Sequence, residues 1–221
     1  MANIQMGTAA GTILGNPPVG DFYIFIDSSN ANAYTLRDSA GTDTILGGPN
    51  PATLYGLYSQ TVQSATITGT AETSIVGSGV GALTVPANFF TVGDSYHGKI
   101  GGKIGDTSNG DDITMRIKAG GTVLASTGLF TLDTTQAISA GGEGWECELD
   151  FTIAAIGATG SICTNGNFAY SKTNDKKVSG YVFQDVQAID TTVANTLDVT
   201  VEWNQTGNDI YSANFVLFKT Y

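Results

Sequence analysis

Residues 145–153 read Trp-Glu-Cys-Glu-Leu-Asp-Phe-Thr-Ile, and apolar and polar side chains alternate along the whole stretch. Successive side chains of a strand point to opposite faces, so this pattern predicts a strand with one buried face and one solvated face. The same alternation occurs in Asp112-Ile-Thr-Met-Arg-Ile-Lys118 and in Leu197-Asp-Val-Thr-Val-Glu-Trp203. Together the three stretches predict antiparallel sheets that cover an apolar core.

The composition supports this prediction. Only 13% of the 221 residues are charged and 29 are glycine, which favours short strands and many turns over long amphipathic helices. Weaker strand patterns lie at 82–91, 95–104, 122–131, 161–170, 181–188 and 213–219. We therefore expect an all-β chain in which residues 64–221 form a jelly-roll β-sandwich head of about eight or nine strands.

Residues 1–46 predict a separate, smaller unit. The apolar run at 21–27 is followed by turn residues and by strand patterns at 33–37 and 42–46, which together predict a three-stranded β-meander. A sheet of this size buries little apolar surface by itself, so we expect it to attach to another protein. The candidate anchor residues are Phe22, Tyr23, Ile24, Phe25 and Ile26.

Residues 47–63 are typical of a linker. They begin Gly-Gly-Pro-Asn-Pro, and glycine and proline interrupt regular structure. Within the linker, Leu54, Leu57 and Tyr58 have helical spacing and predict one or two turns of helix.

The charge distribution excludes some classes of partner. With 9 basic and 20 acidic side chains the formal charge is −11, so the chain lacks the clustered cations that nucleic-acid binding requires. No stretch approaches the roughly 20 apolar residues of a membrane helix, so we expect no membrane insertion. Residues 1–6 lack the basic and apolar regions of a secretory signal, so we expect synthesis in a cytoplasm.

The two cysteines predict free thiols on opposite faces of a sheet. Cys147 shares the buried face of its strand with Trp145 and Leu149. If residues 157–160 form the following hairpin loop, Cys163 pairs with Ala154 and faces solvent. Two thiols on opposite faces do not form a disulfide.

Motifs for catalysis or for metal binding are weak. His97 is the single histidine, and no Gly-x-Ser-x-Gly elbow accompanies it, so we expect a partly exposed strand or loop residue. Asp106 or residues 109–112 could offer oxygen ligands to Ca²⁺, although a turn is the favoured interpretation. The sequence predicts no catalytic residue, cofactor or metal site.

Three carboxylates leave an enzymatic alternative open. Glu146, Glu148 and Asp150 lie on the solvated face of one strand, where neighbours about 7 Å apart could supply the acid and base of a glycosidase. Asp198 and Glu202 decorate a second strand in the same way. A solvated sheet face balanced by basic residues is the favoured interpretation, with Arg116 and Lys118 as the candidates. The tyrosines that could stack on sugars are Tyr170, Tyr181 and Tyr211.

The last strand pattern differs from the others because both of its faces are apolar. Phe215 and Leu217 lie on one face, and Val216 and Phe218 lie on the other. Such a strand is either central between layers or covered by a neighbouring subunit. These four residues are the candidate oligomer interface.

Two parts of the chain resemble proteins of the bacteriophage virion. Pro17-Pro-Val-Gly20 before an apolar strand, with Asp38-Ser-Ala-Gly-Thr42 after the next strand, resembles the N-terminal segment of phage fibre and tail proteins. Residues 113–122, 145–160 and 190–203 resemble the C-terminal β-sandwich modules of environmental phage structural proteins.

The resemblance implies a homotrimeric fibre, spike or capsid-decorating protein with a head like the trimeric tumour-necrosis-factor-type folds. It implies a location on the virion after synthesis in the host cytoplasm, and attachment to a capsid or tail protein through the N-terminal unit. A host glycan or envelope component is the implied ligand, and no catalytic residue is carried over. The alternatives are a small all-β glycosidase or lyase and a secreted carbohydrate-binding or adhesin module.

Overall fold

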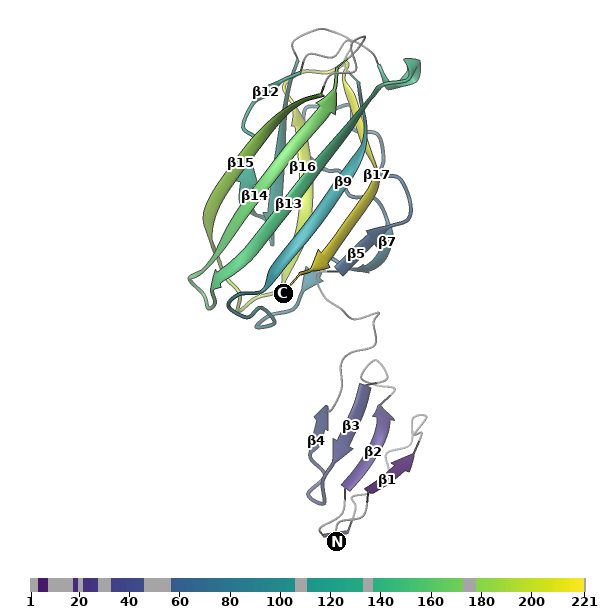
Figure 1. The fold of residues 1–221 in the computed structure, drawn as a ribbon, viewed down its shortest axis with the longest axis vertical. Coiled ribbons are helices and arrows are strands. Elements are labelled where there is room, and N and C mark those ends of the chain that lie inside the picture. Colours follow the sequence, from purple (N-terminus) through teal and green to yellow (C-terminus); the bar gives the residue numbers. More distant parts are fainter. Residues whose placement is uncertain are drawn as a thin grey trace. The chain divides into compact units, whose positions relative to one another are not determined.

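The computed structural model describes residues 4–7, 18–19, 22–27, 33–45, 57–105, 111–132, 137–172 and 178–220. Side chains are described for 18–19, 23, 36–42, 58–105, 111–132, 137–172 and 180–220. The chain divides into two compact units, residues 1–54 and residues 55–221. Regular structure in the described residues is β-strand except for the short 3₁₀ helix η2 (Ile138–Ala140), which confirms the predicted all-β class (Figure 1).

The first unit is a four-stranded sheet. Its strands, in spatial order, are β1 (Ile4–Gly7), β2 (Phe22–Asp27), β3 (Ala33–Arg37) and β4 (Asp43–Ile45). The antiparallel β2, β3 and β4 are the predicted meander, while β1 joins β2 in parallel and was not predicted. The candidate anchor residues 22–26 lie in β2. Apart from Tyr23, their side chains lie outside the described residues, and the anchor role stays a prediction.

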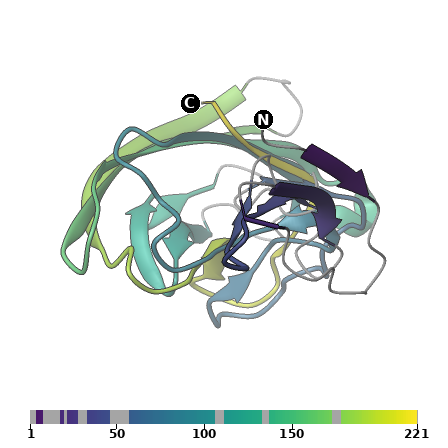
Figure 2. The same cartoon turned by 90° about the horizontal axis from the view of Figure 1, so that it is seen from below.

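The second unit, here called the head, contains two sheets that lie one behind the other (Figures 1 and 2). The seven-stranded sheet has the order β15 (Val178–Ile189), β14 (Gly160–Ser171), β13 (Glu143–Ala155), β9 (Ser95–Gly105), β17 (Asp209–Lys219), β5 (Leu57–Gln60) and β7 (Gly79–Ala82). The second sheet has the order β11 (Thr122–Ser126), β10 (Asp112–Ala119), β16 (Asn195–Trp203) and β6 (Thr73–Ser74). Two short strands extend it, β12 (Phe130–Thr131) on β10 and β8 (Thr84–Val85) on β16.

Pairing within the head is nested. In chain order, β5 pairs with β17, β6 with β16, β9 with β13 and β10 with β11, and every one of these pairs is antiparallel. The first strand thus pairs with the last, and each later pair lies inside the one before it. Strands β14 and β15 continue the sheet outward from β13.

The core of the head lies between the two sheets and follows the predicted alternation. The alternating apolar residues of β10, β13 and β16 are all buried. They are Ile113, Met115 and Ile117 on β10, then Trp145, Cys147, Leu149, Phe151 and Ile153 on β13, and Leu197, Val199, Val201 and Trp203 on β16. Full burial of one such side chain contributes roughly 1.5–3 kcal/mol, so the strand registers are strongly specified.

A β-bulge in β17 connects the core to a polar network. The register between β17 and β9 shifts between Ser212 and Asn214, and Gly102 on β9 is the partner of Ser212. The buried Ser212 donates through its amide to Ser64 Oγ at 2.9 Å, and Gln60 Nε2 donates to the Ser212 carbonyl at 3.1 Å. The bulge therefore binds the segment that precedes β6.

Two predictions about local structure are wrong. Residues 57–60, expected to be helical within a linker, form β5. Tyr58 is buried, its ring lies 5.8 Å from that of Phe215, and its hydroxyl donates to the Gly77 carbonyl, so contacts with the sheet override the helical spacing. Of the predicted strand 82–91, only residue 82 (in β7) and residues 84–85 (β8) are strand.

The buried carboxylate of Asp94 holds the C-terminal strand. Its Oδ1 lies 2.6 Å from Lys219 Nζ, and the Thr91 amide and hydroxyl donate to the same carboxylate at 3.0 and 2.6 Å. Burial raises the pKa of Asp94, but the hydrogen bonds from Lys219 and Thr91 outweigh it, so the pKa lies below its usual value.

Gly102→Ala tests the close approach at the bulge. A Cβ at this position would lie 2.0 Å from the Tyr211 carbonyl oxygen and 2.9 Å from the Ala213 amide nitrogen, so the backbone of β17 has to move. We expect a loss of roughly 2–4 kcal/mol in unfolding free energy, measured by urea denaturation. Gly144→Ala is the control, because its Cβ would meet no atom within 4 Å. Equal unfolding free energies of the two variants would contradict the close approach of β17 to Gly102.

Asp94→Asn tests the buried ion pair. Because the folded pKa of Asp94 is lowered, its contribution is present above the unfolded value, near pH 3.8, and is lost as the pH falls below that value. We expect the variant to be less stable than the parent by about 1–3 kcal/mol at pH 7, with the gap narrowing below pH 3.8. Urea denaturation at several pH values measures this, and a gap that does not change with pH would be evidence against the ion pair.

Candidate functional site

The outer face of the seven-stranded sheet carries the predicted site residues. On this face, side chains from five adjacent strands, β15, β14, β13, β9 and β17, align in cross-strand rows. The rows are Gln184, Asn165, Asp150, His97, Phe218; then Val182, Asn167, Glu148, Lys99, Val216; then Gly180, Ala169, Glu146, Gly101, Asn214. The face therefore mixes amides, charges and apolar groups.

The three carboxylates of β13 lie on this outer face as predicted, but their cation is not the predicted one. Lys99 Nζ lies 2.8 Å from Glu146 Oε2 and 3.1 Å from Glu148 Oε1. These contacts raise the pKa of Lys99 above its usual value. A single ammonium group thus pairs with two carboxylates.

Arg116 and Lys118, the predicted partners, lie on the other sheet. Arg116 Nη1 lies 2.7 Å from Glu202 Oε2, and Lys118 Nζ lies 2.7 Å from Glu72 Oε1. Asp198, on the same strand as Glu202, accepts a hydrogen bond from Ser74. Burial raises the pKa of Asp198. The two acidic strands belong to opposite faces of the head and do not form one site.

His97 is a partly exposed strand residue, as predicted. Its side chain is 31% exposed, and its Nδ1 lies 2.7 Å from Asp150 Oδ1. The Phe218 ring packs against the imidazole with ring centres 5.3 Å apart. His97 thus contacts one carboxylate and one aromatic ring of the neighbouring strands.

The predicted oligomer interface divides into two halves. Phe215 and Leu217 are each 2% exposed and fill the head's own core. Val216 and Phe218 are 42% and 44% exposed on the outer face. A second chain could contact only Val216 and Phe218 of the four residues, because Phe215 and Leu217 are buried. The strand β17 itself is central, between β9 and β5.

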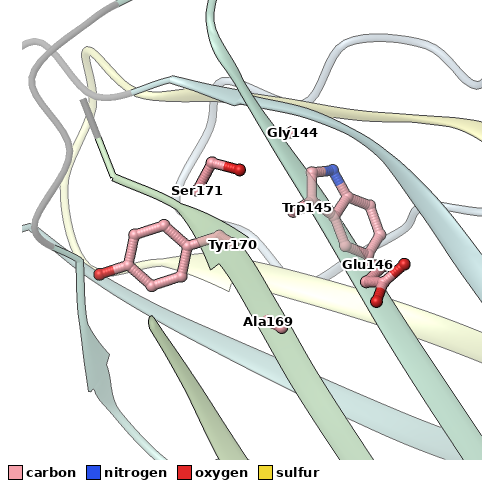
Figure 3. A pocket seen from close by; sticks show the side chains of 6 residues that line it. All are labelled: Gly144, Trp145, Glu146, Ala169, Tyr170 and Ser171. Atoms are coloured by element: carbon pink, nitrogen blue, oxygen red, sulfur yellow. The ribbon is translucent and has the colours of Figure 1, made fainter. Parts of the chain in front are cut away.

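Two shallow hollows adjoin each other on the outer face, and sequence reasoning did not find them. One, of about 250 Å³, is lined by Gly144, Trp145, Glu146, Ala169, Tyr170 and Ser171 (Figure 3). The other, of about 340 Å³, is lined by Lys99, Ile100, Gly101, Gly102, Trp145, Glu146, Ala213 and Asn214. Glu146 lines both, so the hollows are neighbours; together, across β14, β13, β9 and β17, they are here called the trough. Its signal in the sequence is the run of small residues, but their alignment requires the sheet order.

The three tyrosines proposed for sugar stacking differ in exposure. Tyr170 is buried and Tyr181 is exposed. Tyr211 is half-buried and is paired with Lys103 in β9, which is in turn paired with Gly144. Tyr211 therefore belongs to the row of the outer face that borders the trough.

The residues considered for Ca²⁺ lie only partly within the described residues. Asp106 and Asn109 lie outside them, and Asp112 accepts hydrogen bonds from Thr131 and Asn204. Across the described ranges, no group of three or more His, Cys, Asp or Glu side chains is placed to hold a metal ion. No helix in this part of the chain is long and apolar enough to cross a membrane.

Comparison with protein-family models and with curated proteins finds no match to this chain.

The two cysteines are free, with Cys147 buried and Cys163 exposed on the outer face. Burial, with a smaller effect from Glu148, raises the pKa of the Cys147 thiol to about 12. Cys163 pairs with Thr152, two residues from the predicted partner Ala154, and a bulge between Ile153 and Ala155 accounts for part of the shift.

Thiol labelling tests this placement. With a maleimide reagent at pH 7 we expect one modification on the native chain, at Cys163, and a second after denaturation, because the buried thiol is protonated and inaccessible. Mass spectrometry counts the modifications. Cys163→Ser is expected to abolish native labelling, and fast native labelling of Cys147 in that variant would contradict the structure.

Proposed function

We propose that this chain is a non-enzymatic structural protein of a bacteriophage virion, a fibre, spike or capsid-decorating protein with a trimeric jelly-roll head. The observation that carries the proposal is the nested pairing of β5 with β17, β6 with β16, β9 with β13 and β10 with β11. A hairpin of four strand pairs wrapped into two sheets is the plan of a jelly roll, a frequent fold of capsid proteins.

The division into two units supports a role in attachment. The described residues of the first unit form a sheet of four strands, each of three to six residues. Such sheets gain stability by joining a larger protein, either by packing or by strand addition. In this proposal the first unit binds a capsid or tail protein, and the head contacts the host surface, through a glycan or an envelope component.

The outer face supplies a surface for contact between copies. Val216 and Phe218 are exposed there, and Val182 and Val186 are exposed on the same face of β15. They form two groups, one on β15 and one on β17, with β14, β13 and β9 between them. Exposed apolar groups of this kind are candidate contacts with another chain. Closed symmetry would bring this surface of each copy against its neighbours.

The glycosidase or lyase alternative has less support. Glu146 and Glu148 lie on an open face of the sheet and share the ammonium group of Lys99. Ion pairs of this kind are common on protein surfaces and require no catalytic role. A carbohydrate-binding or adhesin module fits the same face, and the mass in solution separates it from the trimer.

Light scattering of the full chain tests the assembly. We expect a mass of about three times 22.9 kDa, because the exposed apolar side chains of the outer face are covered by other copies. The double variant Val216→Lys/Phe218→Lys is expected to be monomeric at the same concentration, because it places charges in the contact.

The control carries the same two charges elsewhere. Val193 and Leu129 are exposed residues of connecting segments, so Val193→Lys/Leu129→Lys is expected to leave the trimer unchanged. A monomeric parent chain would overturn the proposed assembly, and a trimer that survives in the outer-face variant would place the contact on another surface.

A further inference from the structure

We propose that the trough on the outer face binds a neutral carbohydrate, which rests on the proposed attachment function and assigns it a site and a ligand class. The trough crosses β14, β13, β9 and β17. With strands about 4.8 Å apart, it spans roughly 14 Å, which is enough for a short oligosaccharide.

The floor of the trough is open because its residues are small. Ala169, Gly144, Gly101 and Gly102 come from three neighbouring strands and present almost no side chain. A Cβ added at Gly144 would meet nothing within 4 Å, so the space above this residue is unfilled. A sugar ring could therefore approach the sheet closely at this point.

The walls offer both donors and acceptors of hydrogen bonds. Glu146 is a carboxylate acceptor at the centre, Lys99 is an ammonium donor, and Ser171 and Asn214 stand at the two ends. A hydroxyl-rich ligand can donate and accept with the same group, so it can satisfy this mixed set. An apolar ligand would leave these polar groups desolvated and unpaired.

The charge of the site favours a neutral ligand over an anionic one. The two carboxylates Glu146 and Glu148 share one cation, Lys99, and the whole chain carries a formal charge of −11. An acidic sugar would be repelled at close range and during approach. We therefore expect the site to discriminate against uronic and sialic acids.

The trough adjoins the exposed apolar residues of β17. Asn214, which lines the trough, is two residues from Val216 on β17. Asn214 and Gly101 are cross-strand partners. The proposed copy contact at Val216 and Phe218 and the proposed ligand site are therefore neighbours, because Lys99 lines the trough and is the cross-strand partner of Val216.

Affinity electrophoresis of the full chain tests the proposal. The probes are dextran, mannan and xylan as neutral polysaccharides and polygalacturonate as an acidic one. We expect retardation by at least one neutral polymer and none by polygalacturonate. Gly144→Val, which fills the floor without a steric clash at Cβ, is expected to weaken binding about tenfold or more, and Glu146→Gln by about fivefold or more.

Matched controls separate loss of binding from loss of structure. Glu202→Gln removes a carboxylate from the other sheet of the head, and Gly69→Val adds the same side chain at another open position. Both are expected to bind as the parent chain does. Absence of binding to every neutral polymer, binding that Gly144→Val leaves unchanged, or preference for polygalacturonate would each overturn the proposal.

Light scattering on the same samples distinguishes failure of the proposed ligand site from failure of the proposed function. A trimer that binds no neutral polymer refutes the trough and leaves the structural role intact. A monomer that binds through Gly144 and Glu146 refutes the assembly and supports the site.

Discussion

The apolar layer between the two sheets of the head constrains the positions of the other residues in that unit. On β10, β13 and β16 every second side chain lies in this layer, from Ile113 through Trp145 to Trp203. A slip of one residue would turn a whole strand of apolar side chains into solvent. The same constraint fixes what lies outside, so the acidic residues of β13 reach the outer face because their neighbours fill the core.

The bulge in β17 links the core to the outer face. It requires glycine at 102, where any Cβ would strike the Tyr211 carbonyl, and the indole of Trp145 donates to that carbonyl and to the carbonyl of Lys103. Gly101 is required as well, because a Cβ there would lie 2.7 Å from the Trp145 carbonyl oxygen. Gly144 differs from these two glycines, because a Cβ there would meet no atom within 4 Å. The open floor of the trough at Gly144 is therefore not a consequence of the close packing at Gly101 and Gly102.

Lys99 stands between the two surfaces proposed for function. In one direction along the sheet it adjoins Val216, and in the other it lines the trough beside Glu146. Its ion pairs reduce the repulsion between neighbouring carboxylates on an acidic chain. A single exposed face can thus combine an apolar part suited to contact between copies with a polar part suited to a hydroxyl-rich ligand.

The sequence by itself determined which residues are buried within each strand, because the two-residue period of the strand is a local property of the backbone. This period correctly predicted the buried face of residues 145–153, the free thiols and the exposure of His97. The predicted partner of Cys163 was wrong by two residues, but a shift of two residues leaves a side chain on the same face, so the predicted faces of both cysteines are correct. Only the tertiary structure decided which strands are neighbours. It placed Lys99 beside Glu146, moved Arg116 to the opposite sheet and buried Phe215 within its own head, because these contacts join residues distant in sequence. These contacts depend on the order of the strands in each sheet, which no local sequence pattern specifies.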